Sequence, residues 1–122
     1  MADLFRLTEA YARITANYEE QALYTAVDVL AYDSLDVLIT AAFEAPGVGA
    51  VFGLTLVSGI ETSSSDSWVV AGSPSPMLRV TTPTVAFSVS GGFFRYLRWR
   101  VTTFEDATAA CFTIAVVGRK NA

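Results

Sequence analysis

The stretch LDVLIT, residues 35–40, decides the fold class of this 122-residue chain. Its side chains Leu35, Val37 and Ile39 occupy every second position. Because successive side chains of a β-strand point to opposite faces, this alternation predicts a strand with one buried face. The same period of two recurs in residues 27–29, 52–56, 85–89 and 112–116. We therefore predict an all-β chain.

Turn-forming residues separate these alternating runs, and their spacing predicts the architecture. Asp, Ser, Gly and Pro gather in residues 32–34, 45–49, 62–67, 72–76, 90–92 and 105–107. Such residues favour turns over regular structure. They delimit roughly seven or eight strands at intervals of about 10–12 residues, the spacing of a β-sandwich or jelly roll. We predict one jelly-roll domain of about eight antiparallel strands over residues 21–122.

Residues 1–20 fit two structures, and we predict that they form an N-terminal arm outside the sandwich. Leu4, Leu7, Tyr11 and Ile14 recur at three- and four-residue spacing, which suits one face of a short helix. Part of the same segment also alternates as a strand would. The apolar side of the arm either covers one open end of the sandwich or reaches a neighbouring subunit.

The composition limits the classes of partner. Hydrophobic residues make up 52% of the chain and charged residues 16%, and the mean hydropathy is +0.43. The longest charge-free run lies between Glu44 and Glu61 and is shorter than the roughly 18–20 apolar residues of a membrane-spanning helix. Asp3, Arg6 and Glu9 fall where a secretory signal would be apolar, so we expect the chain to be made and kept in a cytoplasm. The apolar excess then predicts a large contact with another protein.

The residue inventory is poor in groups that perform chemistry. The chain has no His, and its lone cysteine, Cys111, is flanked as in a buried strand. Asp28, Asp33 and Asp36 lie close together in sequence, but their spacing matches no dedicated calcium loop. A net charge of −4 works against nucleic-acid binding. We expect no enzyme activity, no cofactor, no metal site and no nucleic-acid or membrane partner.

The stretch over residues 93–102, FFRYLRWRVT, is the most distinctive in the chain. As a strand it predicts an inward face of Leu97, Trp99 and Val101. The opposite face then holds Phe94, Tyr96, Arg98 and Arg100. Arginine and aromatic side chains on one face are typical of protein interfaces. The alternatives are arginines that pair with carboxylates on adjacent strands, and aromatic stacking on nucleic acid.

A family resemblance is carried by six stretches: residues 25–29 (TAVDV), 32–39 (YDSLDVLI), 56–59 (LVSG), 65–68 (SDSW), 94–101 (FRYLRWRV) and 112–117 (FTIAVV). Together they resemble the small jelly-roll domains of tailed-phage virion proteins, among them head decoration (cement) proteins. The resemblance implies a structural virion protein that bridges capsid subunits. Its implied partners are the major capsid protein or other virion subunits and further copies of itself, with a trimer favoured, and its implied location is the virion.

The same stretches are also similar to discoidin and galactose-binding-like sandwiches, which implies an alternative function as a carbohydrate-binding module. In that case Trp68, beside the serine-rich loop, is the candidate for stacking on a sugar. Otherwise Trp68 fills the core. For the virion function we predict that the contact surface includes Leu4, Leu7, Tyr11, Ile14, Phe94, Tyr96, Arg98 and Arg100.

Overall fold

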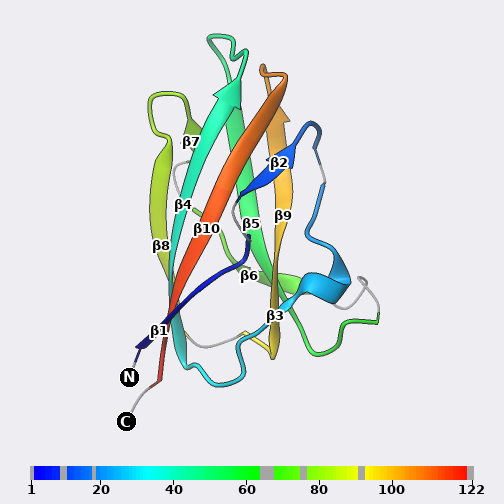
Figure 1. Ribbon diagram of the computed structural model, residues 1–122, viewed down its shortest axis with the longest axis vertical. Coiled ribbons are helices and arrows are strands. Elements are labelled where there is room, and N and C mark those ends of the chain that lie inside the picture. Colours follow the sequence, from blue (N-terminus) through cyan, green and yellow to red (C-terminus); the bar gives the residue numbers. More distant parts are fainter. Residues whose placement is uncertain are drawn as a thin grey trace.

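Two antiparallel sheets face each other in the computed structural model, which describes residues 2–8, 11–17, 19–63, 68–74, 77–90 and 93–120 (Figure 1). The first sheet has the order β1 (Ala2–Arg6), β10 (Ala109–Arg119), β4 (Ser34–Glu44) and β8 (Thr84–Ser90), and β2 (Ala12–Ile14) also pairs with β10. The second has the order β3 (Val27–Asp28), β9 (Tyr96–Glu105), β5 (Val51–Gly59) and β6 (Val69–Gly72), and β7 (Leu78–Arg79) pairs with β5. The predicted all-β sandwich is confirmed.

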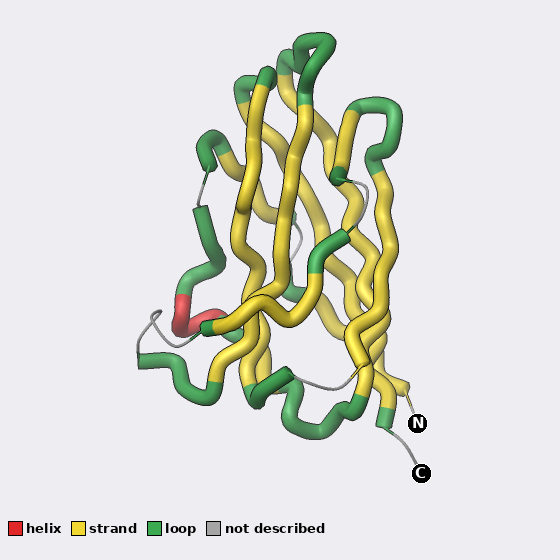
Figure 2. The backbone as a smooth tube through the Cα atoms, turned by 180° about the vertical axis from the view of Figure 1, so that it is seen from behind, coloured by secondary structure: helices red, strands yellow, loops and turns green. Residues whose placement is uncertain are grey.

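The strand pairing is nested, as in a long hairpin folded over on itself. β5 pairs with β6, β4 with β8, β3 with β9 and β1 with β10. Each later pair therefore encloses the earlier one along the chain, and the pairs are divided between the two sheets. This wrapping is the jelly-roll arrangement. In the described part of the chain, η1 (Leu23–Thr25) is the only helical turn, and it lies at the margin of the molecule (Figure 2).

The core lies between the sheets and is built from the alternating positions. Leu35, Val37 and Ile39 of β4 are buried, as the sequence predicts. The Phe112 ring of β10 lies 5.1 Å from the Phe52 ring of β5 and 5.0 Å from the Trp99 ring, which it meets edge to face. Aromatic side chains supply much of the buried area that holds two sheets together.

The described part of residues 1–20 is built into the sandwich and does not form a separate arm or a short helix. β1 and β2 both pair with β10, and Leu7 and Ile14 belong to the core. The Leu7 amide also donates a hydrogen bond to the Ile114 carbonyl, 3.1 Å away. The segment is extended because its backbone pairs with β10 while alternate side chains reach the core.

The two sheets differ in what covers their outer faces. All nine residues of β5 in the second sheet are buried on both sides. Side chains that precede β6 and β7 lie on its outer face, where Trp68 lies against Gly59 and Met77 against Gly53. A methyl group at Gly59 would stand 2.7 Å from the indole, so this close contact requires glycine. On β4 of the first sheet, by contrast, Leu38 and Thr40 are exposed.

Candidate protein-interaction surface

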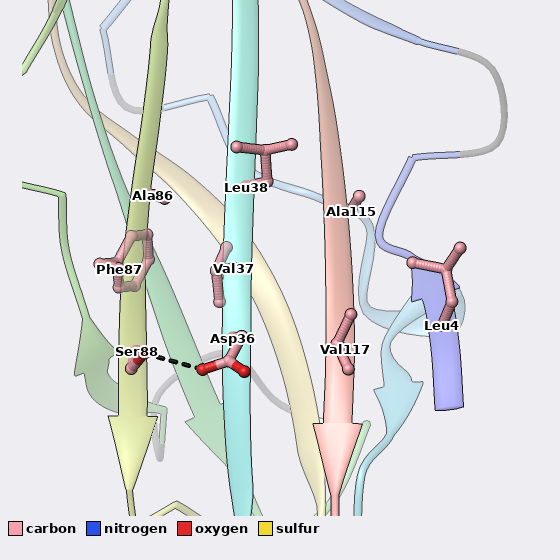
Figure 3. A pocket seen from close by; sticks show the side chains of 9 residues that line it. All are labelled: Leu4, Asp36, Val37, Leu38, Ala86, Phe87, Ser88, Ala115 and Val117. Carbon is pink, nitrogen blue, oxygen red and sulfur yellow. Dashed lines mark hydrogen bonds between the residues drawn. The ribbon is translucent and has the colours of Figure 1, made fainter. Parts of the chain in front are cut away.

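The outer face of the first sheet carries an open apolar groove of about 440 Å³. Figure 3 shows the groove crossing β8, β4, β10 and β1. Its lining residues are Leu4, Asp36, Val37, Leu38, Ala86, Phe87, Ser88, Ala115 and Val117. Leu4 is 68% exposed and Leu38 46% exposed. A sheet face turned toward water normally carries polar side chains, so the apolar groove makes this face a candidate contact surface.

Strand register explains how the groove forms. Leu38 of β4 stands directly opposite Ala115 of β10 on one side and Ala86 of β8 on the other. A large side chain therefore projects between two small ones. The sequence reasoning missed this surface because it followed the inward positions of each strand. The signal was available, since the outward positions 38, 86 and 115 are all apolar.

The apolar face continues toward the other end of the sheet. A second hollow of about 230 Å³ lies between β4 and β10 and is lined by Tyr11, Thr40, Ala41, Ala42, Cys111, Phe112 and Thr113. Leu4 and Tyr11 therefore both reach the outer face of the first sheet, as the predicted contact surface requires. Leu7 and Ile14 do not, because their side chains are buried in the core of this chain. Those two residues cannot contact a neighbour.

Ion pairs lie at both ends of this face. At one end Arg119 Nε lies 2.6 Å from Asp36 Oδ2, and Ser88 donates a hydrogen bond of 2.8 Å to the same carboxylate. At the other end Arg13 Nε lies 2.7 Å from Glu44 Oε2. The hydrogen bond from Arg119 and then that from Ser88 lower the pKa of Asp36. This face therefore combines an apolar centre with ion-paired ends.

The predicted faces of residues 93–102 are correct, but one face is covered. Leu97, Trp99 and Val101 point into the core. Phe94 is exposed, and Tyr96 and Arg100 are partly exposed. Arg98 is only 1% exposed, so it cannot act at an interface with another chain.

Residues 19–21 pair alongside this part of β9 and engage its arginines. The Gln21 amide donates to the Trp99 carbonyl, and the Val101 amide donates to the Glu19 carbonyl. Glu20 Oε2 lies 2.8 Å from Arg100 Nε, and Arg98 Nη1 donates a 2.7 Å hydrogen bond to the Gln21 carbonyl. The arginines therefore serve intramolecular pairing, the alternative reading of this stretch.

Trp68 lies against Arg98 on the outer face of the second sheet. The Arg98 guanidinium lies over its ring, and Trp68 is 7% exposed. Stacking on a sugar needs an accessible ring face, which this burial denies. Trp68 is therefore a packing residue, and the candidate for the carbohydrate alternative is lost.

Among the described residues, no group of three or more His, Cys, Asp or Glu side chains is placed to hold a metal ion. Asp28 is engaged by Arg95 at 3.0 Å and by the Leu30 amide at 3.0 Å. Asp36 is engaged at the ion pair described above. Within the same residues, no helix is long and apolar enough to cross a membrane.

No protein-family model matches the chain, and no curated protein sequence matches it. Among the solved structures that match the chain are three of low sequence identity. A chain of the Bacillus endospore appendages, which form disulfide-linked pili, has 15% identity and a TM-score of 0.41 over 99% of this chain and 88% of its own. YomS, derived from the SPBc2 prophage, has 12% identity and a TM-score of 0.46 over 95% of this chain and 93% of its own.

The third is the CBM22-1–GH10 portion of Clostridium thermocellum endo-1,4-β-D-xylanase 10B in complex with xylohexaose. It has 11% identity and a TM-score of 0.44 over 97% of this chain and 26% of its own. With every TM-score below 0.5, these likenesses assign no function to the chain.

Proposed function

We propose that this chain is a structural virion protein, of the capsid decoration or cement type, which stabilises a particle by bridging its subunits. It performs no catalysis. The observation that carries the proposal is the apolar outer face of the first sheet, centred on Leu38. Its partners are the major capsid protein or other virion subunits, and it functions in the virion after assembly in the host cytoplasm.

Two features of the structure support this proposal. Trp68 and Met77 lie on the outer face of the second sheet and Glu20 pairs there with Arg100, whereas the outer face of the first sheet holds an open apolar groove. A rigid, preformed surface loses little conformational entropy when it binds. Contacts of this kind, repeated over many copies in a particle, add up to a large stabilisation.

The experiment uses particles of the virus that encodes the chain. We expect mass spectrometry to find the chain in purified particles at a fixed ratio to the major capsid protein. Particles from a deletion strain should release DNA at a lower temperature, and added purified chain should restore the original release temperature. Leu38→Lys should fail to restore it. Leu30→Lys is the matched control. Leu30 is an exposed leucine like Leu38, but it does not line the apolar groove of the first sheet.

Absence of the chain from particles, or an unchanged release temperature after deletion, would contradict the proposal. A glycan array supplies the contrasting outcome. Selective binding to one glycan class, with no binding to particles, would favour the carbohydrate-binding module.

A further inference from the structure

One edge of the first sheet lacks the features that normally keep sheet edges from pairing. β8 pairs with β4 on one side, in unbroken register from Ser34–Ser90 to Thr40–Thr84. On its other side, no described residue makes a backbone hydrogen bond to Thr84–Ser90. An edge strand of this kind presents a row of backbone donors and acceptors to a second strand.

The composition of β8 does nothing to block such pairing. Proteins protect sheet edges with charged residues, proline, bulges or very short strands. β8 has the sequence TVAFSVS, which contains no charge and no proline. The other described edge strands differ. β1 carries Asp3 and Arg6, β3 has only two residues, and β6 has four with a register shift in its pairing.

The side-chain pattern of β8 indicates which strand fits there. Read from Phe87 outward in both directions, the strand carries side chains of matching size. Val85 and Val89 are two residues away, and Ala86 and Ser88 are one residue away. An antiparallel copy centred on Phe87 would place Val85 opposite Val89 and Ala86 opposite Ser88. A twofold interface needs this self-complementarity, because each side must match its own copy.

Phe87 provides a second reason for pairing. Its side chain packs against the core but remains partly exposed at the open edge of the sandwich. Gly72 of β6 lies against the Phe87 and Val89 side chains, so β6 packs under the inward side of β8 and leaves the backbone edge free. In the paired arrangement the two Phe87 rings would cover each other, which removes apolar surface from water.

We propose that this chain forms a twofold dimer by antiparallel pairing of β8 with β8 of a second copy, centred on Phe87. The two first sheets then join into one continuous sheet in the order β1-β10-β4-β8-β8-β4-β10-β1. The apolar grooves of the two copies lie on the same face of the joined sheet. This inference concerns self-association through an edge and does not depend on the virion function.

The first test measures the mass of the purified full chain by size-exclusion chromatography with light scattering. We expect a particle of twice 13.1 kDa at micromolar concentration. Ala86→Lys should raise the dissociation constant more than about tenfold, because it places a charge on the pairing edge and brings the two lysines into a diagonal like-charge pair across the new strand pair. At protein concentrations low enough for both chains to be monomers, its urea midpoint should match the wild-type value, since Ala86 is exposed in the single chain. Leu38→Lys is the control and should stay dimeric, because Leu38 lies one strand in from the edge.

The second test fixes the register with disulfides in a Cys111→Ser background. Ala86→Cys and Ser88→Cys chains, carrying tags of different size, should crosslink when mixed under oxidising conditions. Neither should crosslink alone, because a residue and its own copy lie too far apart for a disulfide at these positions.

A monomer or a trimer would overturn the proposal. A dimer that Leu38→Lys dissociates and Ala86→Lys leaves intact would also overturn it, because that result means face-to-face packing. The release of DNA from deletion particles tests the virion function separately. A failure of the dimer proposal can therefore be distinguished from a failure of the proposed virion function.

Discussion

The guanidinium carbon of Arg98 lies 4.3 Å from the centroid of the Trp68 ring. This contact joins β9 to the residue that immediately precedes β6. Nη1 of Arg98 also lies 3.5 Å from Glu20 Oε1, so one side chain contacts both Trp68 and the segment that pairs alongside β9. The pKa of the Arg98 guanidinium lies below its ordinary value, mainly because burial lowers it. Glu20 raises this pKa, and Arg100 lowers it further. The closed outer face of the second sheet depends on this cluster.

Trp68→Ala should destabilise the chain strongly. The substitution removes a buried indole that packs on both Arg98 and Gly59. Loss of a buried tryptophan side chain costs about 3–5 kcal/mol, and here it also opens the cover over β5. Urea denaturation followed by circular dichroism measures the change in the free energy of unfolding. A loss below about 1 kcal/mol would mean that the indole packs loosely.

Arg98→Met should leave the free energy of unfolding within about 1 kcal/mol of wild type, or raise it. Nε and Nη2 of Arg98 have no hydrogen-bond partner in the described part of the chain, so the guanidinium is desolvated without full compensation. Methionine keeps the apolar stem against Trp68 and removes the charge. Arg98→Ala is the matched variant and should be clearly less stable, because it also removes the stem. If Met and Ala are equally damaging, the guanidinium itself stabilises the fold.

Sequence alternation predicts which way a side chain points, but not what lies over it. Leu35, Val37 and Ile39 were assigned to the core correctly because the opposite sheet always covers the inward face. Arg98 was assigned correctly to the outward face, yet it is buried. Its cover comes from Gln21 and Trp68, which are 77 and 30 positions away along the chain. No local pattern encodes that contact.

The N-terminal segment shows a second limit of local patterns. Leu7 and Ile14 are seven residues apart, a spacing that fits one face of a helix, and residues 11–15 also alternate as a strand would. Backbone pairing with β10 decides between these options, and β10 lies about a hundred residues later in the chain. The apolar groove was missed for a related reason, since it forms only where positions 38, 86 and 115 come into register.

Ile14→Ala and Leu4→Ala should separate a core residue from a surface residue in the same segment. Ile14 is 1% exposed, so its truncation should cost about 2–5 kcal/mol of unfolding free energy. Leu4 points outward on β1, and its truncation should cost less than about 0.5 kcal/mol. Thermal and urea unfolding of both variants provide the measurement. Equal losses would contradict the pairing of β1 and β2 with β10.

The Cys111 thiol should react slowly with iodoacetamide at pH 8. Burial raises its pKa, and Glu44 raises it further through charge and through a 3.7 Å contact between Sγ and Oε2. A raised pKa leaves less thiolate, which is the reactive form. Glu44→Gln should speed alkylation, because it removes the negative charge and leaves Arg13 to favour the thiolate. Arg13→Met is the opposite control and should slow alkylation relative to wild type.

Stability should be nearly constant from about pH 5.5 to 8 and should fall in acid. The chain has no His, so no ordinary side chain titrates in that interval. Hydrogen bonds to Asp28, Asp36 and Glu44 lower their pKa values in the folded state. The unfolded chain therefore binds more protons in acid, so this stabilisation is complete above about pH 5 and is lost as the pH falls through the folded pKa values. Asp36→Asn should flatten the acid side of a plot of urea midpoint against pH. Ser88→Ala should flatten it less, because it leaves the stronger Arg119 bond in place. An acid limb in Asp36→Asn as steep as that of wild type would show that the Arg119 pair contributes nothing.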